Sequence, residues 1–349
     1  MEGVEGYNFF MDTLTHVLTG VVVAKAIDDD QIGRWGTLAG LAMGAFPDAD
    51  FVLGLFHQQF YLQYHRDFTH SLLLIPFYAL FFSWLFTKIS KRPHLWRFYK
   101  VCLPVLVGHV ILDLLTSYGT MILSPFSDQR FAWDLVFIID LIFSGIVIVP
   151  LLAIFFLRRE ARWICRGAIL GLIVYILFCS FQHGRAMEEV KAFSKGLREE
   201  VVQVAALPQP ASPFRWALYL ETGDKVFQGF VDLRRKDLPK PAGTQSSLFE
   251  KLESLYYPPG SIPFQSMDKS LDSPWVTRAL ATEGIKFYFW FARFPVVKSV
   301  ESSDGRHRVE WMDVRFFLPG IRLPFVYFVE FDDSGQVRAE GFVESRRGL

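Results

Sequence analysis

The chain has 349 residues, of which half are apolar and 16% are aromatic, and its 36 Lys and Arg residues balance 36 Asp and Glu residues. This balance excludes the basic bias that is typical of nucleic-acid-binding proteins, so we expect no nucleic-acid partner. The three cysteines lie in apolar stretches without a CxxC pair, which argues against a disulfide framework and against a thiolate metal site. The N-terminus lacks the basic region of a cleavable signal peptide, so we expect the membrane helices to direct insertion.

The apolar residues are concentrated in the first half of the chain, in stretches that approach the length of about 20 residues needed to cross a bilayer. We predict six membrane segments, at residues 13–27, 36–56, 70–88, 99–117, 135–157 and 163–182. The first is short for a complete span, and the first, second and fourth contain His and Asp residues, which weaken the pattern. The expected fold is mainly α, a polytopic helical membrane bundle.

Lysine and arginine are distributed unevenly between the loops. The loops after the first, third and fifth segments are basic, whereas the loops 57–69 and 118–134 contain only Arg66 and Arg130. The positive-inside rule places the basic loops in the cytoplasm. Both termini then lie on the outer side of a plasma membrane that the chain crosses several times.

The composition changes near residue 185, which predicts a membrane-embedded domain at 1–184 and an extracytoplasmic α+β domain at 185–349. An amphipathic helix, GRAMEEVKAFSKGLREEVVQ, is expected to open the second domain. RWALYLETGDKVFQGFVDL predicts two strands joined by a TGDK turn. Short helices are expected at SSLFEKLESL and SPWVTRALATEG, and strands at IKFYFWFARF, RVEWMDVRFFL, FVYFVEFDD and QVRAEGFVE.

Histidines and aspartates from different segments fall at a similar depth near the outer face. These residues are His16, Asp48, Asp50, His65, His70, His109 and Asp113. The last two are four residues apart and therefore share one face of a helix. Imidazole and carboxylate are usual ligands of zinc, and also of manganese and iron. We therefore predict a site for one or two divalent ions, with zinc the preferred metal.

Each of these residues also has a structural interpretation. The Asp-x-Asp sequence after Pro47 can be a turn former, and His65 can be an interfacial histidine. His109 and Asp113 can form a hydrogen-bonded pair between helices, although ionisable groups within a membrane are functional by default. The pattern leaves open whether Asp48 or Asp50 is the ligand.

Four further residues are candidates for catalysis. Asp128 and Asp134 lie in the outer loop after the fourth segment, where either carboxylate can carry a proton. Arg66 and Arg130 can pair with a phosphate group, or can extend their charged ends to the membrane interface. Asp140 is expected about one turn into the fifth segment.

The strings MDTLTHVLTG, FPDAD, HRDFTHSLL and GHVILDLLTSYGTMILSPFSDQRFAWD resemble the YdjM/YbcI-type family of bacterial inner-membrane proteins, which are described as metal-dependent hydrolases. The resemblance covers residues 11 to about 185, and SPFRWALYL resembles the start of the outer domain in longer members. It implies a bacterial inner-membrane location and a metal-dependent hydrolytic activity. Asp67 departs from the glycine expected there, and its carboxylate is either an additional ligand or solvated.

The order of the ligands is also similar, more distantly, to that of zinc-dependent phospholipases C and the related single-strand nucleases. That similarity implies one metal held by Asp48 or Asp50 together with His70, His109 and Asp113. It implies a second metal held by His16 and Asp113, with Asp113 bridging. A second His-x-x-x-Asp/Glu pair is missing, so a third metal is not expected.

We therefore expect a membrane-embedded hydrolase that acts on a lipid phosphoester or ester at the outer face, with metal-bound water as the nucleophile. One alternative is a metal-ion transporter, which is expected to place its ligands near the bilayer midplane. Another is a non-catalytic scaffold with unknown protein partners, which leaves the convergence of histidines and aspartates unexplained.

Overall fold

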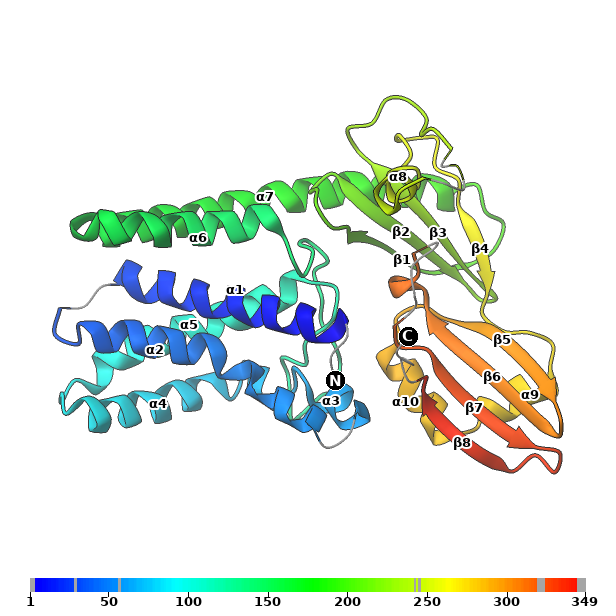
Figure 1. Cartoon of the computed structure of the whole chain (residues 1–349), viewed down its shortest axis with the longest axis horizontal. Helices are drawn as coiled ribbons and strands as arrows, with labels where there is room; N and C mark the ends of the chain where they lie inside the picture. The colour runs from blue at the N-terminus through cyan, green and yellow to red at the C-terminus, as the bar shows by residue number, and fades with distance from the viewer. Residues whose placement is uncertain are drawn as a thin grey trace. The chain divides into compact units, whose positions relative to one another are not determined.

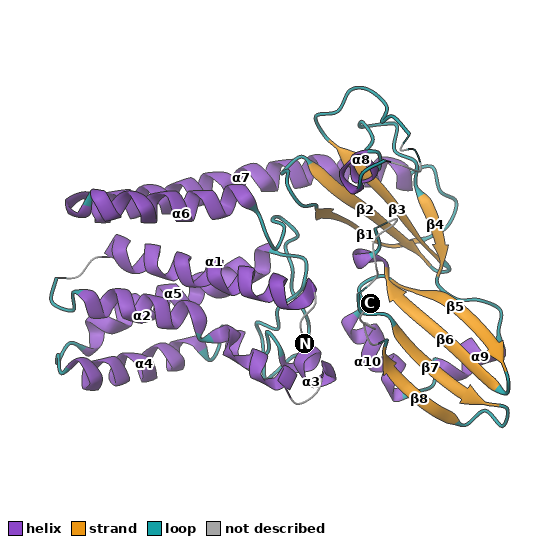
Figure 2. Ribbon diagram, in the orientation of Figure 1, coloured by secondary structure: helices purple, strands orange, loops and turns teal. Residues whose placement is uncertain are grey.

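The computed structural model describes residues 4–27, 30–55, 58–241, 243, 246–318 and 324–343. The chain divides into two compact units. One comprises Met1–His183 and Pro208–Pro213, and the other Gly184–Leu207 and Phe214–Leu349. The first unit is helical, and the second contains two antiparallel sheets (Figures 1 and 2).

The helical unit is built from long apolar helices and short connecting helices. The α-helices are α1 (Val4–Ile27), α2 (Arg34–Ala45), α3 (Gln58–Tyr64), α4 (Ile75–Ser90), α5 (Leu95–Leu115), α6 (Leu141–Phe156) and α7 (Ala161–Ser194), the last of which continues into the second unit. The 3₁₀ helices are η1 (Pro47–Leu55), η2 (Phe68–His70) and η3 (Arg158–Glu160). A core around α5 packs against α2 and α4 on one side, and a second core joins α1, α6 and α7.

Among the described residues, two helices are long and apolar enough to cross a membrane, Leu95–Leu115 and Arg158–Ser194. A third candidate is the pair Gln59–His70 and Ile75–Ser90, which is bent by 75° at its break. Thr13–Ile27 and Leu141–Phe156 are apolar but shorter. Length and composition thus support two or three spans, and the six-span topology stays a prediction.

The second predicted segment, 36–56, is not one helix. Its helix α2 ends at Ala45, and a 3₁₀ helix begins at Pro47. Proline lacks the backbone N–H that would continue an α-helix, so the chain tightens into a different turn at the FPDAD sequence. The last residue of the predicted segment, Phe56, lies outside the described residues.

Two other predicted boundaries were wrong. Asp140 is not one turn inside the fifth segment, because its side chain caps α6 by accepting hydrogen bonds from the backbone N–H groups of Ile142 and Phe143 at 2.9 and 2.8 Å. The sixth segment and the amphipathic helix after it are one continuous helix of 34 residues. The end of the predicted amphipathic helix is instead strand β1, which begins at Val201.

Glycine lets α1 and α2 pack closely. A Cβ atom on Gly40 would lie 2.6 Å from the carbonyl oxygen of Gly20, and one on Gly44 would lie 2.8 Å from the carbonyl oxygen of His16. Real Cβ atoms cannot approach that closely. The two helix backbones therefore meet beside His16, which lies within α1.

The second unit contains two four-stranded sheets, in the orders β1-β2-β3-β4 and β5-β6-β7-β8. Their strands are β1 (Val201–Pro208), β2 (Arg215–Thr222), β3 (Lys225–Asp232), β4 (Gln265–Asp268), β5 (Pro295–Ser303), β6 (Arg306–Asp313), β7 (Tyr327–Asp332) and β8 (Val337–Phe342). Short helices α8 (Leu248–Glu253), α9 (Pro274–Ala279), α10 (Glu283–Phe291) and η4 (Val314–Phe316) connect them. One hydrophobic core is formed by buried side chains from both sheets.

Most predicted elements of this unit are confirmed, including the β2–β3 hairpin, which pairs Arg215 with Asp232. The strand predicted for IKFYFWFARF was wrong, because this sequence forms α10. The Thr282 side chain caps that helix at the N–H of Ile285, and its buried residues include Ile285, Tyr288 and Phe291, at helical spacing. A run that is apolar on every side has no periodicity that separates a strand from a helix.

Candidate metal centre

The predicted polar residues of the helical unit converge in one buried cluster. They come from α1, η1, the segment between α3 and η2, η2 itself and α5. Each is at most 6% exposed: His16, Asp48, Asp50, His65, His70, His109 and Asp113. Residues separated by up to 97 positions in the sequence thus meet in one place, in a region shielded from water.

Four ligand atoms from four residues form the centre of the cluster. The Nε2 atoms of His70 and His109 lie 3.3 Å apart. Asp113 Oδ2 lies 2.9 Å from the first and 3.5 Å from the second. Asp48 Oδ1 lies 3.8 and 3.4 Å from the same two nitrogens. Two imidazoles and two carboxylates therefore face a common point.

The hydrogen bonds on the outer side of each ring determine which nitrogen faces this point as an acceptor. His109 Nδ1 lies 2.9 Å from the carbonyl oxygen of Gly44, which can only accept, so Nδ1 carries the proton. His70 Nδ1 lies 2.9 Å from Thr69 Oγ1, whose own proton is donated to Asp50 Oδ2 at 2.9 Å. The Thr69 oxygen therefore accepts from His70 Nδ1. In neutral rings, both Nε2 atoms then present lone pairs to each other.

This arrangement fits a divalent metal ion. In a regular tetrahedron with metal–ligand bonds of about 2.0–2.1 Å, neighbouring ligand atoms are about 3.3–3.4 Å apart. The five separations that involve His70 Nε2 or His109 Nε2 range from 2.9 to 3.8 Å, close to that value, so either carboxylate could share an ion with the two imidazoles. Asp48, His70 and His109 could hold a metal ion, as could His16, His109 and Asp113.

The two aspartates of FPDAD have different surroundings. Both oxygens of Asp50 accept hydrogen bonds from the protein: Oδ1 lies 2.7 Å from His65 Nδ1, and Oδ2 accepts from the N–H of Arg66 at 3.1 Å and from the Thr69 hydroxyl. Asp48 Oδ2 accepts from the Thr13 hydroxyl at 2.9 Å, while Oδ1 faces the central point. Asp50 and His65 thus hold the 65–70 segment in place, and Asp48 lies among the central ligand atoms.

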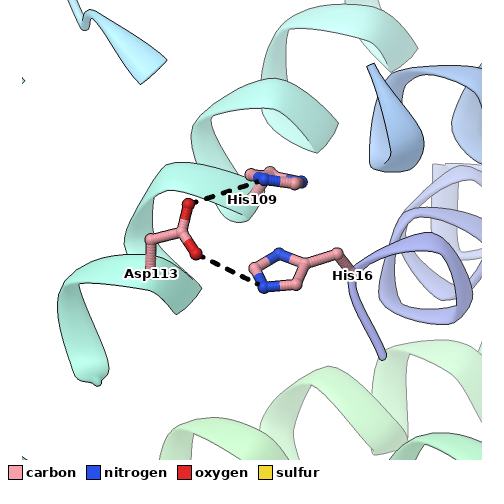
Figure 3. A group of neighbouring side chains, drawn as sticks. All are labelled: His16, His109 and Asp113. Atoms are coloured by element: carbon pink, nitrogen blue, oxygen red, sulfur yellow. Dashed lines mark ion pairs between the residues drawn. The ribbon is translucent and has the colours of Figure 1, made fainter. Parts of the chain in front are cut away.

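The two oxygens of Asp113 point in different directions, and Figure 3 shows its carboxylate between two histidines. Oδ2 faces the central point, whereas Oδ1 lies 3.4 Å from His16 Nε2 and 2.9 Å from Nη2 of Arg66. The rings of His16 and His109 are 4.0 Å apart. His16 thus lies on the Oδ1 side of Asp113, whereas the central point lies on the Oδ2 side.

The predicted catalytic residues are in three different environments. Arg66 is only 1% exposed, so it does not extend to a membrane interface. Arg130 is half-buried and donates to the carbonyl oxygens of Tyr118 and Gly119 at 3.2 and 3.3 Å. Asp134 is buried, whereas Asp128 is exposed and takes part in none of the cluster's described contacts.

Sequence reasoning did not identify the threonines that support the cluster. Thr69 connects Asp50 to His70, and Thr13 holds Asp48. Thr116 Oγ1 accepts from Nη1 of Arg66 at 3.0 Å and donates to the carbonyl oxygen of Asp113 at 2.8 Å. All three threonines lie within three residues of a ligand candidate in the sequence. This proximity is the only feature of the sequence that could have identified them. Asp67, which stands where the resemblance predicts a glycine, is half-buried and belongs to neither metal-ligand group.

Comparison with known proteins identifies the family of the chain. The YdjM inner membrane protein family matches residues 11–186, which include every residue of the cluster. The chain belongs to this family. It is also 27% identical over 235 residues to the uncharacterized protein YfhP of Bacillus subtilis (strain 168), a match that covers 63% of this chain and 68% of YfhP. No solved structure matches the chain.

Proposed function

We propose that the cluster binds one divalent metal ion, preferentially zinc, and that the protein is a membrane-embedded hydrolase of lipid ester or phosphoester bonds. The observation that carries this proposal is the pair of Nε2 atoms 3.3 Å apart, facing two carboxylates. Two lone pairs at this distance repel each other unless a proton or a metal ion lies between them. A metal ion satisfies both nitrogens and both carboxylates at once.

The ligand set supports zinc over a soft or strongly hydrated ion. Imidazole and carboxylate are common zinc ligands, and the calcium and magnesium sites of proteins use oxygen donors almost alone. Manganese and iron accept the same ligands as zinc. The three cysteines of the chain lie in α5 and α7 and are absent from the described metal-ligand groups.

A hydrolytic site needs a coordination position for water in addition to the protein ligands. Asp48, His70 and His109 form one of the described groups that could hold a metal ion, and three protein ligands would leave a coordination position for water. A divalent ion held by this group would lower the pKa of a bound water molecule and polarise a substrate oxygen. The hydrogen bonds from His70 to Thr69 and from His109 to Gly44 would fix the orientation of both rings for this chemistry.

A small cavity lies beside His16. Its polar lining includes Thr15, His16, Thr116, Asp140 and Ser144. Its apolar lining comprises Leu112, Leu115, Val136, Phe137, Ile138 and Phe143, from α5, α6 and the segment before α6. This cavity is large enough for a few water molecules, so it could bring water or one polar group of a substrate to the side of His16.

The membrane location supports a lipid as the substrate. The helices α4, α6 and α7 expose large apolar side chains such as Phe77, Leu141 and Leu170. Such surfaces are stable only against lipid or another apolar surface. With the predicted six spans, the distribution of Lys and Arg favours an orientation with the cluster near the outer face and the second unit outside the cytoplasm.

The burial of the cluster also favours a second candidate, a structural metal site that joins α5, η1 and η2. Four-coordinate sites closed by protein side chains are typical of structural zinc. The two functions make different predictions. A structural ion contributes its binding energy to folding, whereas a catalytic ion is required for turnover.

The experiment is metal analysis of the detergent-purified protein, with a hydrolysis screen of the same samples on phospholipid and neutral ester lipids. We expect about one equivalent of zinc or a related ion in the wild type and its loss in His70→Ala and Asp113→Ala. His94→Ala is the matched control, because His94 lies at the opposite end of α5 and makes no side-chain cap. Metal retained in both cluster variants would contradict the site, and bound metal without any lipid hydrolysis would favour the structural alternative.

A further inference from the structure

We propose that Arg66 takes the place of a second metal ion, so that the guanidinium group and a single divalent ion share the carboxylate of Asp113. The inference rests on the proposed metal site and specifies its composition. A two-metal site would use Asp113 as a bridge, with Oδ2 on one ion and Oδ1 on the other. In this protein, Oδ1 lies 2.9 Å from Nη2 of Arg66.

The position next to Asp113 Oδ1 otherwise has the ligands of a second site. His16 Nε2 lies 3.4 Å from this oxygen, a separation that one metal ion can span with two bonds of about 2 Å. His16, His109 and Asp113 form one of the two described groups that could hold a metal. Because His109 Nε2 faces the first ion, His16 Nε2 and Asp113 Oδ1 are the two protein ligands left for a second ion, and that oxygen already pairs with a cation.

Arg66 is held in this position from several sides. Its Nη1 donates to Thr116 Oγ1 at 3.0 Å, and its backbone N–H donates to Asp50 Oδ2. Its guanidinium lies 5.1 Å from the centre of the Tyr118 ring. Its φ angle of 63° is in the left-handed region, which costs free energy for a residue with a side chain. The fold thus maintains a strained backbone to keep this cation at the site.

The charges of the cluster support one ion rather than two. Asp48, Asp50 and Asp113 carry three negative charges in a region that is at most 6% exposed. With neutral histidines, one divalent ion and the charge of Arg66 compensate all three. A second divalent ion would leave two excess positive charges away from water, which is strongly unfavourable. Removal of Arg66 would leave one negative charge uncompensated with one ion, and would reduce the excess positive charge with two ions from two to one, so that a second ion is no longer strongly opposed.

The test is equilibrium dialysis of the full-length, detergent-purified protein against increasing zinc, followed by metal and protein quantification. We expect one equivalent in the wild type, two in Arg66→Ser, and one in the double variant Arg66→Ser with His16→Ala. Arg66→Lys should retain one equivalent, because it keeps the positive charge. Arg130→Ser is the matched control, since Arg130 lies 4.8 Å from the same Tyr118 ring but donates to backbone carbonyls. It should also bind one equivalent.

Two equivalents in the wild type, or one in a folded Arg66→Ser variant, would overturn the inference. If Arg66→Ser does not fold, His16→Ala decides the question, because His16 belongs only to the site that Arg66 replaces. We expect His16→Ala to retain its single ion with an unchanged affinity, and loss of that ion would overturn the inference. A wild-type protein that binds no metal would instead contradict the proposed metal site, and the inference would fall with it. Manganese-loaded Arg66→Ser should show the electron paramagnetic resonance spectrum of two coupled ions, and an isolated-ion spectrum would contradict the proposal.

Discussion

Asp50 reaches His70 through the hydroxyl group of Thr69, which donates to the carboxylate at 2.9 Å and lies 2.9 Å from the imidazole Nδ1. This chain orients the ring and makes its inward nitrogen more basic. The aspartate that does not face the central point thus still influences a proposed metal ligand. The 65–70 segment, which contains Thr69 and His70, also places Arg66 beside Asp113.

The Thr69 link gives the first prediction. Thr69→Val retains the shape of the side chain and removes the hydroxyl, so we expect metal affinity to fall by about 10- to 100-fold, as for other residues that orient a metal ligand. Affinity is measured by competition with a zinc chelator. Thr87→Val in α4 is the control, because the Thr87 hydroxyl bonds only to the carbonyl oxygen of Ser83 within its own helix. Equal affinities in the two variants would remove Thr69 from the account.

The two aspartates of the FPDAD sequence should separate in a paired experiment. Asp48→Asn should lose the metal, because its Oδ1 is one of the four central ligand atoms. Asp50→Asn should retain metal but unfold at a lower temperature, because it weakens the contacts with His65 and the Arg66 N–H. Metal content and thermal unfolding are measured on the same samples. Metal loss in Asp50→Asn with full retention in Asp48→Asn would reverse the assignment.

Gly44 connects helix packing to the site. The Cβ atom of Gly44→Ala would lie 2.8 Å from the carbonyl oxygen of His16, so α1 must move away from α2. Overpacking of this kind costs about 1–3 kcal/mol, and the shift also displaces the carbonyl oxygen that accepts from His109. We expect both a lower unfolding temperature and weaker metal binding. Gly145→Ala is the control, since a Cβ there meets nothing within 4 Å, and a similar loss in that variant would contradict the packing argument.

Asp134 and Asp128 form a natural pair for testing the proton carrier. The backbone N–H groups of Trp133 and Leu135 donate to the carbonyl oxygens of Leu114 and Leu115, directly after Asp113, and Asp134 between them is buried. Its φ of 56° is tolerated well by asparagine. We expect Asp134→Asn to keep its metal and fold but to lose lipid hydrolysis, whereas the exposed Asp128→Asn retains activity. Wild-type turnover in Asp134→Asn at equal metal occupancy would exclude it from the mechanism.

The convergence of the cluster could be predicted from the sequence because each ionisable residue lies near the same end of an apolar segment. The i,i+4 spacing of His109 and Asp113 also fixes their common face on α5. The choice between Asp48 and Asp50 could not be predicted, because it depends on the 3₁₀ turn that begins at Pro47. Sequence patterns locate residues along a helix but do not describe such a turn.

The burial of Arg66 could not be predicted from the sequence either. A lone arginine in a short outer loop is typical of a membrane interface. Here the left-handed backbone at Arg66 directs its side chain to Asp113 and Thr116. A tertiary contact across 47 residues decides this environment, and no local pattern contains it.

X-ray absorption spectroscopy of the purified protein at the zinc edge tests the central claim most directly, because it reports the ligands of the bound ion without a substrate. We predict four or five nitrogen and oxygen ligands at about 2.0–2.1 Å, with the outer-shell scattering of two imidazole rings. The outer-shell scattering of two imidazole rings should be absent from His70→Ala and His109→Ala, which each lack one of the two rings. It should be unchanged in His94→Ala. A shell dominated by sulfur at about 2.3 Å, or protein that binds no metal under saturating zinc, would contradict the account.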